Sequence, residues 1–291
     1  HPLFEPAARR VRDAVERGER IVVYGDYDVD GISATAILMR CLALLKADAA
    51  FYIPDRIEEG YGLNAAAIRK LAAEGTKLLI TVDCGVSAAT ETALAAELGL
   101  DVIVTDHHEP GDVVPATPLL INPKLPGCPY PFRDLSGAGL AFKLAWAVGR
   151  DLSSGARVAP EFRDFLLDAV SLAALGAIAD VVPLIGENRV LASYGLRGLS
   201  ASNAPGLRAL REAAGAADQP LTGFDIAFKL APRLNAAGRM GSAVQAVEML
   251  ITPDLDRARE IAAHLNRENT RRQKLQEGIL ADARGMIEEL G

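Results

Sequence analysis

Three aspartates at alternate positions follow the first apolar run of the chain, in the stretch IVVYGDYDVDG at residues 21–31. The run Ile21–Tyr24 predicts a buried β-strand, and Asp26, Asp28 and Asp30 come soon after it. In an extended segment, alternate side chains share one face, and three carboxylates there repel one another unless a cation lies among them. The pattern therefore predicts a site for a hard divalent metal ion. A solvated acidic turn is the simpler alternative.

A predicted helix follows this acidic segment directly. Gly31 permits a sharp turn, and Ile32–Lys46 has the apolar content of a buried helix. The amino-terminal end of a helix favours an anion such as phosphate, because its free N–H groups and its dipole attract negative charge. The sequence therefore places a favourable position for an anion beside the three acids.

Two later stretches repeat the arrangement of an apolar run followed by acids. The run Leu78–Val82 ends at Asp83, with a cysteine and a glycine after it. The run Val102–Thr105 ends at Asp106, and two histidines follow, His107 and His108. Ligands bind at the carboxyl ends of the strands in open α/β sheets. Three predicted strands therefore deliver acids or imidazoles to one edge of a sheet.

The order of predicted elements favours an α/β fold with a doubly wound, mainly parallel sheet of five strands flanked by helices. The predicted strands are Ile21–Tyr24, Ala50–Ile53, Leu78–Val82, Val102–Thr105 and Leu119–Ile121. The predicted helices between them are Ala7–Arg17, Ile32–Lys46, Ala65–Glu74 and Ala88–Leu98, the last capped by Ser87. We expect this α/β core to occupy residues 1–135.

The second half of the chain has the sequence pattern of helices rather than of alternating strands and helices. Residues 136–252 predict a helical part that contributes Asp180, and residues 253–291 predict a long connecting helix. Ser136 is expected to cap a helix over Gly137–Val148, and the glycines there lack the spacing of a phosphate-binding loop. Trp146 is expected in the core. The polar middle of the long helix contains a basic cluster that contacts either solvent or nucleic acid: Arg267, Arg271, Arg272 and Lys274.

Composition excludes several classes of protein. The length of 291 residues suffices for one large domain or two smaller ones, and half of the residues are hydrophobic, which allows a sizeable core. No apolar run approaches the roughly 18 residues of a membrane span. The net charge of −7 argues against a general polyanion binder, although a local basic patch would still bind nucleic acid. The cysteines, Cys41, Cys84 and Cys128, are few and widely spaced, as is typical of free thiols in a reducing compartment.

The candidate ligands are too numerous for one structural ion. They are Asp26, Asp28, Asp30, Asp83, Asp106, His107, His108 and Asp180. Such a set suits two divalent ions that share a carboxylate and promote phosphoryl displacement. Mixed carboxylate and imidazole ligands favour Mn²⁺, with Mg²⁺ next. The sequence argues against zinc bound by thiolates because Cys84 has no second cysteine nearby, and no G-x-S-x-G elbow supports a serine nucleophile.

Three arginines are the next most informative residues. Arg56 lies in a loop rich in glycine and charge, on the same predicted edge as the acids. Arg233 and Arg239 bracket RLNAAGR, which we interpret as a turn rich in glycine and alanine. Fork-shaped donors of this kind bind phosphate, whereas a single exposed arginine more often forms a surface salt bridge.

Seven ordered segments carry a resemblance to a known family. GDYDVDG at 25–31, VDCG at 82–85 and TDHH at 105–108 resemble the first three motifs of the DHH phosphoesterase superfamily. GAIADVVPL at 176–184 resembles its fourth motif. Three further segments are similar to the RecJ family of bacterial single-strand-specific DNA exonucleases: PDRIEEGYGLN, YPFRDLSGAGLAFKLAWAV and APRLNAAGRM.

The resemblance implies a role for each acid and histidine. Asp28 would bind one metal ion, and Asp83 would bridge the two ions. Asp106 would orient neighbouring groups, and His108 would face the scissile phosphate. The second ion would be held by Asp30, His107 and Asp180.

One position departs from the pattern of the wider superfamily. Many relatives that act on small substrates have a histidine where this chain has Tyr24. Asp26 or water would then complete the first metal site. The resemblance further implies that substrate is bound by Arg56, Arg233, Asn235 and Arg239.

The resemblance implies a 5′→3′ exonuclease that hydrolyses single-stranded DNA by a two-metal mechanism, in DNA repair and recombination. Two Mn²⁺ ions would be its cofactors, with Mg²⁺ as a substitute. The same resemblance implies single-strand-binding protein and a repair helicase as partners, and a cytoplasmic protein without a membrane. The chain starts at His1, stops within a helical pattern and lacks the GGGH-type motif of a DHHA1 domain, so we expect a piece of a longer protein.

Two other functions compete with this one. The first is a phosphoesterase for short oligonucleotides, cyclic dinucleotides or pyrophosphate, against which the RecJ-like segments argue. The second is a catalytically inactive scaffold, like the related subunit of the eukaryotic replicative helicase. Such scaffolds lose metal ligands, whereas this chain keeps almost all of them.

Overall fold

The sheet of this protein has five parallel strands in the order β2-β1-β3-β4-β5. The computed structural model describes every residue except 154–157, 218, 240–242 and 291. The strands are β1 (Arg20–Gly25), β2 (Ala49–Tyr52), β3 (Thr76–Val82), β4 (Asp101–Thr105) and β5 (Leu119–Ile121). The predicted fold class and all five predicted strands are confirmed. Their carboxyl ends meet at one edge because every neighbouring pair is parallel.

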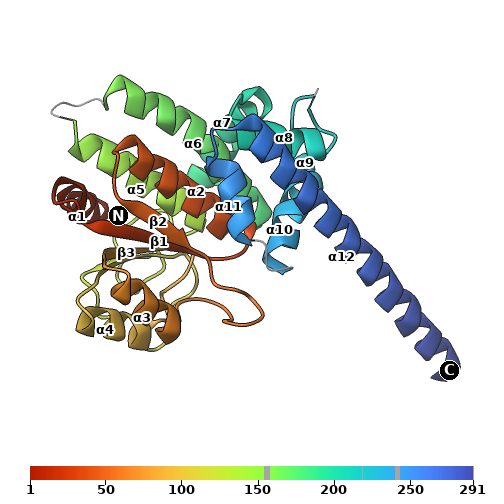
Figure 1. Cartoon of the computed structure of the whole chain (residues 1–291), viewed down its shortest axis with the longest axis horizontal. Coiled ribbons are helices and arrows are strands. Elements are labelled where there is room, and N and C mark those ends of the chain that lie inside the picture. Colours follow the sequence, from red (N-terminus) through yellow and green to blue (C-terminus); the bar gives the residue numbers. More distant parts are fainter. Residues whose placement is uncertain (154–157, 218, 240–242, 291) are drawn as a thin grey trace.

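Helices cover both faces of the sheet (Figure 1). The first helices are α1 (Phe4–Glu16), α2 (Val29–Leu44), α3 (Ala65–Ala73), α4 (Ala89–Glu97), α5 (Gly137–Asp151) and α6 (Pro160–Ala179). Further along the chain come α7 (Gly186–Ala201), α8 (Pro205–Ala213), α9 (Gly223–Asp225), the π-helix η1 (Ile226–Leu230), α10 (Ala231–Arg239), α11 (Ala243–Ile251) and α12 (Leu255–Leu290). This is the predicted succession of an α/β part, a helical part and a long helix. The residue limits proposed for these parts stay a prediction.

Alternation along β1 divides the core into two layers. Ile21 and Val23 pack into the larger cluster with α1, α2, α5 and α6. Val22 and Tyr24 point to the opposite face, into a smaller cluster with α3. Successive side chains of a strand alternate between faces, so one strand supplies both layers. Both faces of the central strands are therefore buried, which fixes the sheet edge that carries the acids.

The start of α2 differs from the prediction, and the difference changes the geometry of the acids. The helix begins at Val29, because the Oδ1 atom of Asp28 accepts hydrogen bonds from the N–H groups of Asp30 (2.8 Å) and Gly31 (3.0 Å). Asp28 is thus the N-cap and Asp30 lies in the first helical turn. The expectation that these acids lie on one face of an extended segment is wrong. They converge through a strand end, a cap and a helical turn instead.

Three smaller predictions are also wrong. Ser87 does not cap α4, which begins after Ala88 without a side-chain cap. Trp146 is 45 % exposed and lies outside the core, because it faces outward from α5. The segment RLNAAGR forms most of α10 and is a helix where we expected a turn.

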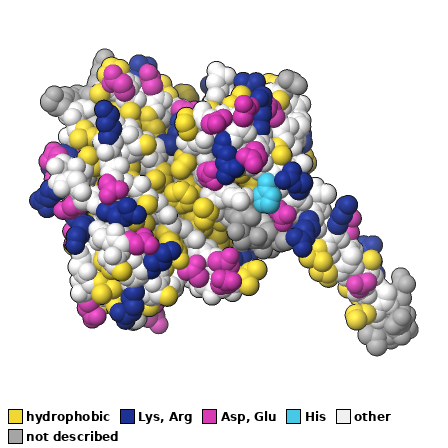
Figure 2. Space-filling model, viewed as in Figure 1, with side chains coloured by type: hydrophobic (Ala, Val, Ile, Leu, Met, Phe, Trp, Pro, Cys, Tyr) yellow, Lys and Arg dark blue, Asp and Glu magenta, His cyan; other side chains and the backbone are white. Residues whose placement is uncertain are grey.

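The last helix projects from the body of the protein (Figure 1). Its first turns pack on α8, α10 and α11, and the part that projects carries exposed apolar side chains such as Leu275, Ile279 and Met286. Figure 2 shows hydrophobic and charged side chains mixed along this arm. Within the described residues, no helix combines the length and the apolar character needed to cross a membrane.

Candidate metal centre

The predicted acids and histidines meet at the carboxyl edge of the sheet. Asp26 and Asp28 follow β1, and Asp83 follows β3. Asp106, His107 and His108 follow β4, while Asp180 is the residue at which α6 ends. Four separate stretches of the chain therefore contribute to one site.

Ligand atoms in this site form three overlapping groups, each with its atoms within 4.8 Å of one another. One group contains Asp26, Asp28 and Asp83. A second contains Asp30, His107 and Asp180, and a third contains Asp83, His107 and His108. Asp83 belongs to two groups, and its Oδ1 atom lies 3.0 Å from the Nε2 atom of His107. The bridging position proposed for Asp83 is thus compatible with the geometry.

Three buried polar atoms in the site have no hydrogen-bond partner among the described residues: Oδ1 of Asp26, Oδ1 of Asp83 and Nε2 of His107. Buried polar atoms are nearly always satisfied, so a cluster of unpaired ones needs an explanation. The Nε2 atom of His107 also faces Asp180 (3.6 Å) and Asp30 (3.7 Å). Burial lowers the pKa of His107 to about 4, so its imidazole is neutral, which is the form that binds a metal. These residues fit a cation.

Burial, which disfavours the charged form, raises the pKa values of four carboxyl groups of the site. Burial and then the charge of Asp28 raise the pKa of Asp26 to about 7 and that of Asp180 to about 6. Burial and then Asp28 raise the pKa of Asp30 to about 8, and burial and then Asp30 raise that of Asp83 well above its usual range. Acids that cannot all ionise without a cation favour a divalent ion.

Asp30 is held by the amino-terminal end of α5. The N–H of Gly137 donates to Oδ2 of Asp30 (2.6 Å), and the N–H of Ala138 donates to Oδ1 (3.0 Å). A β-carbon on Gly137 would lie 2.5 Å from Oδ1 of Asp83, and one on Gly176 would lie 2.2 Å from Oδ1 of Asp30. Gly137, in the segment that we excluded as a phosphate loop, therefore binds a carboxylate, and Gly137 and Gly176 together leave room for two of the acids.

Asp106 belongs to none of the three groups and orders the histidine loop. It accepts hydrogen bonds from the N–H groups of Val86 (2.8 Å), His107 (2.7 Å) and His108 (3.1 Å). Its Oδ1 atom also lies 2.8 Å from Nδ1 of His108. Burial alone would raise the pKa of Asp106, but the hydrogen bonds from His108 and the backbone outweigh it and lower that pKa. An ionised Asp106 places the proton of His108 on Nδ1, which leaves Nε2 available to substrate.

The residues predicted to bind substrate have different surroundings. Arg56 is exposed, and its guanidinium lies 5.1 Å from the ring centroid of Tyr27, beside the acids. Asn235 accepts the N–H of Val29 (3.2 Å), so it supports the start of α2. Arg233 donates to Asn266 on α12 (2.9 Å) and to the carbonyl of Lys229. The side chain of Arg239 lies outside the described residues.

Tyr24 does not lie among the acids. It is fully buried, its hydroxyl donates to the carbonyl of Gly62 (2.9 Å), and its ring stacks on Tyr52. Asp26 does lie among them. Sequence reasoning missed Tyr61, whose hydroxyl contacts both Asp83 and His108, and the only available signal was its position between two glycines.

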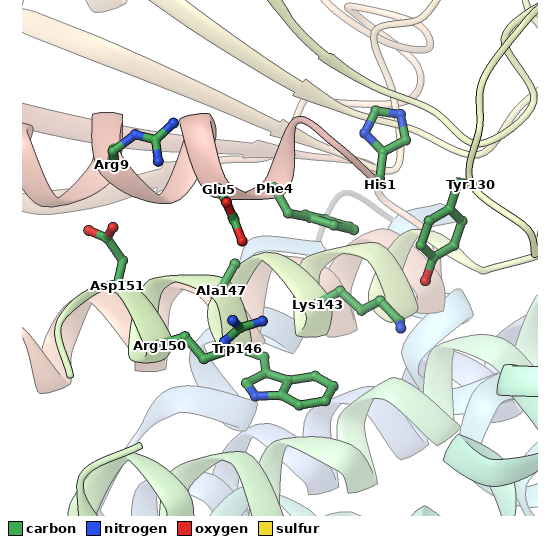
Figure 3. Close-up of a pocket in the computed structure, with 10 residues that line it drawn as sticks. All are labelled: His1, Phe4, Glu5, Arg9, Tyr130, Lys143, Trp146, Ala147, Arg150 and Asp151. Carbon is green, nitrogen blue, oxygen red and sulfur yellow. The ribbon is translucent and has the colours of Figure 1, made fainter. Parts of the chain in front are cut away.

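Among the cavities of the described residues, one lies away from the site and another lies at its margin. The cavity in Figure 3 has a volume of about 470 Å³ between α1 and α5, and none of the predicted site residues lines it. A smaller one of about 240 Å³ lies beside His108 and is lined by Tyr61, Ser87 and Glu91 among others. The metal centre itself is an edge of the sheet at which side chains converge.

Comparison with known proteins agrees with this geometry. Residues 20–174, more than half of the chain, match the model of the DHH family, N-terminal domain. The chain is 44% identical over 288 residues to the single-stranded-DNA-specific exonuclease RecJ of Bacillus subtilis, covering 99% of this chain and 35% of that protein. It is 43% identical over 274 residues to the exonuclease of the same name from Thermus thermophilus, covering 94% and 39%.

Solved structures show the same similarity. A crystal structure of exonuclease RecJ bound to manganese superposes with a TM-score of 0.86 at 42% identity, covering 96% of this chain and 68% of that one. RecJ from Thermus thermophilus in complex with Mn²⁺ gives a TM-score of 0.82 at 39% identity, covering 96% and 39%. The chain spans between about a third and a half of the length of the curated RecJ relatives it matches.

Replacing Gly137 by alanine should weaken Mn²⁺ binding about 10- to 100-fold, the usual cost of disturbing a group that supports metal ligands. The added methyl would collide with Asp83 while Asp30 depends on the same backbone. Isothermal titration calorimetry with Mn²⁺ measures the effect. Gly223→Ala is the matched control, because Gly223 is also the first residue of a helix and a β-carbon there meets nothing within 4 Å. Equal affinity in both variants would contradict the crowding argument.

Asp28→Asn should separate the capping role of Asp28 from its charge. Asparagine caps helices as well as aspartate, so the variant should fold with an unchanged or higher melting temperature without metal. Mn²⁺ at 100 times its dissociation constant should stabilise the unaltered protein by about 2.7 kcal/mol and the variant by much less. Thermal unfolding with and without Mn²⁺ tests this. The free energy of unfolding of Asp28→Ala should be about 1 kcal/mol lower than that of Asp28→Asn, because alanine cannot cap the helix.

Proposed function

This chain belongs to the DHH family, and on that premise we propose that it carries the nuclease centre of a 5′→3′ exonuclease that hydrolyses phosphodiester bonds of single-stranded DNA. The convergence of Asp26, Asp28, Asp30, Asp83, His107 and Asp180 around unpaired buried atoms carries this proposal. The names of the RecJ relatives support the substrate and the reaction. The expected role in DNA repair and recombination, in the cytoplasm, forms part of the same proposal.

Two Mn²⁺ ions are the proposed cofactors, with Mg²⁺ as a substitute. Relatives crystallised with manganese and with magnesium support both ions. One ion would be held by Asp28, Asp83 and Asp26, and the other by Asp30, His107, Asp180 and Asp83. When bound, such a pair supplies an activated water and stabilises the charge of the transferring phosphoryl group.

His108 is the proposed proton donor to the leaving oxygen. Its Nδ1 faces Asp106, and this hydrogen bond, despite partial burial, raises the pKa of His108. A protonated imidazole anchored through Nδ1 presents the N–H of Nε2, and it can pass that proton to an alkoxide that leaves. Asp106 therefore acts on the reaction through His108, by fixing the direction of its ring.

Substrate phosphates are proposed to meet Arg56, which is exposed at the rim of the acids. Arg233, Asn235 and Arg239 belong to the proposed substrate side as well, although Asn235 already supports α2 and Arg233 is held by α12. Single-strand-binding protein and a repair helicase remain proposed partners through family resemblance.

The function is tested with single strands labelled at either end. With Mn²⁺, label at the 5′ end should be released first as mononucleotides, and duplex DNA should resist. Preferential cleavage of dinucleotides, cyclic dinucleotides or pyrophosphate would support the small-substrate alternative. Binding of Mn²⁺ without any hydrolysis would support an inactive scaffold.

Asp83→Ala should abolish cleavage while the protein still folds, because one carboxylate contacts both groups of ligands. Initial rates on a 5′-labelled strand, with circular dichroism as the folding control, measure the outcome. A variant that keeps its rate within about tenfold of the unaltered protein would have lost only ~1.4 kcal/mol of barrier stabilisation. That result would overturn the two-metal proposal.

Arg56→Ala should raise KM for 5′-phosphorylated single strands about tenfold or more, the cost of one charge-assisted hydrogen bond. Mn²⁺ affinity should not change, because Arg56 packs on the ring of Tyr27 and belongs to none of the ligand groups found among the described residues. Arg163→Ala is the matched control: this exposed arginine lies at the opposite end of α6 from Asp180, roughly 25 Å away at 1.5 Å per residue. Identical kinetics in both variants would remove Arg56 from the substrate site.

A further inference from the structure

We propose that Tyr61 is a positioning residue of this centre, whose hydroxyl joins His108 to the backbone of Asp83 and keeps Nε2 of His108 directed at the leaving oxygen. The inference rests on the proposed function for its catalytic consequence. Its structural part, the ordering of His108 by Tyr61, stands on the geometry of these two side chains.

The loop between β2 and α3 is hydrogen-bonded to the sheet on both sides of Tyr61, whose side chain is 53 % exposed. Before it, the carboxylate of Glu59 accepts hydrogen bonds from the hydroxyl of Tyr52 (2.6 Å), the N–H of Asp55 (2.8 Å) and the side chain of Asn64 (3.0 Å). After it, the carbonyl of Gly62 accepts the hydroxyl of Tyr24 (2.9 Å). The loop is thus anchored to β1 and β2, and the buried Tyr24 acquires a function in supporting it.

Two glycines turn Tyr61 toward the metal centre. Gly60 and Gly62 have φ angles of +82° and +81°, a region that side chains other than glycine rarely adopt. The ring of Tyr61 stands edge-on to His108, with ring centroids 5.8 Å apart, and edge-on to Tyr27 at 6.4 Å. Tyr61 therefore packs between the histidine loop and the acidic segment after β1.

The hydroxyl of Tyr61 contacts two groups that matter for catalysis. It donates to the carbonyl of Asp83 (3.2 Å) and lies 3.2 Å from Nδ1 of His108. Asp83 has a φ angle of +62°, which is costly for a residue with a side chain and persists only where the surroundings hold it. The hydrogen bond from Tyr61 restrains that backbone on one side, and the N–H of Asp83 donates to Thr105 on the other (3.0 Å).

The positions of the protons follow from the neighbours. Nδ1 of His108 lies 2.8 Å from an oxygen of Asp106, so Nδ1 must carry a proton, since two acceptors would repel at that distance. The single proton of the Tyr61 hydroxyl goes to the carbonyl of Asp83, and its oxygen accepts a share of the proton on Nδ1. Asp106 and Tyr61 thus hold Nδ1 from two directions, which fixes both the tautomer and the plane of the ring.

Removal of this hydroxyl should therefore impair mainly the protonation of the leaving oxygen, because the N–H of Asp83 keeps its hydrogen bond to Thr105. Tyr61→Phe keeps the ring contacts with His108 and Tyr27 but lets the imidazole tilt. On single-stranded DNA we expect kcat to fall about tenfold, part of the 10²- to 10⁴-fold that proton transfer contributes. KM and the dissociation constant for Mn²⁺ should stay within twofold of those of the unaltered protein. A twofold change in a dissociation constant corresponds to about 0.4 kcal/mol of binding free energy.

A comparison of leaving groups isolates the proton-transfer step. Nitrophenolate leaves a phosphodiester without needing a proton, so the p-nitrophenyl ester of thymidine 5′-phosphate should be cleaved by Tyr61→Phe at nearly the normal rate with Mn²⁺. His108→Ala should show the same selectivity with a larger loss on DNA. Tyr130→Phe is the matched control, because it also removes a hydrogen-bonded tyrosine hydroxyl, in this case one that donates to the carboxylate of Glu187, away from the site.

A second readout needs neither metal nor activity. In ¹⁵N-labelled, metal-free protein, the N–H signal of Nδ1 of His108 should be visible and slow to exchange with solvent. The signal is assigned by its loss in His108→Ala, and it should exchange at least about tenfold faster in Tyr61→Phe. The positioning role would be overturned if the exchange rate were unchanged in Tyr61→Phe. It would also be overturned if this variant lost cleavage rate equally on single-stranded DNA and on the p-nitrophenyl ester. If the unaltered protein cleaved neither DNA nor the p-nitrophenyl ester but kept the protected N–H signal, the proposed nuclease activity would be contradicted. The ordering of His108 by Tyr61 would still stand.

Discussion

Repulsion among carboxylates at one edge of the sheet governs the rest of this structure. Asp28, Asp30, Asp83 and Asp180 are brought together by β1, β3, α2 and α6, and burial raises the pKa of three of them. Such an arrangement is costly unless a cation neutralises it. The fold must therefore supply enough stability elsewhere to hold the acids in place, and the two apolar layers on the faces of the sheet supply it.

Close packing of the backbone against the acids also fixes the positions of their carboxylates. Gly137 and Gly176 have no room for a side chain, because carboxylate oxygens of Asp83 and Asp30 occupy the space. Gly31 is equally restricted, since a β-carbon there would lie 2.6 Å from the carbonyl oxygen of Asp26. The ligands are thus confined by main chain, which cannot rotate away as a side chain can. This explains how several like charges keep a defined geometry.

The helical part of the chain is coupled to the metal centre through short contacts. Asn235 on α10 accepts the N–H of Val29, and a β-carbon on Gly238 would lie 2.3 Å from the carbonyl oxygen of Tyr27. Arg233 on the same helix is bound to Asn266 of α12. The seating of the long helix is thereby linked to the acidic segment after β1. On the other side, the loop with Tyr61 is linked to the same centre through Asp83 and His108.

The sequence by itself determined the strands and which residues stand at their ends. Apolar runs such as Leu78–Val82, followed at once by Asp83, reveal both features because strand burial and strand ends are local properties. The helical turn that carries Asp30, the outward face of Trp146 and the helix over RLNAAGR were not predictable in this way, because caps and long-range packing decide them. Only the tertiary structure brought Gly137 to Asp30 and Tyr61 to His108. Such contacts join residues far apart in the chain, and they leave no periodic signal in the sequence.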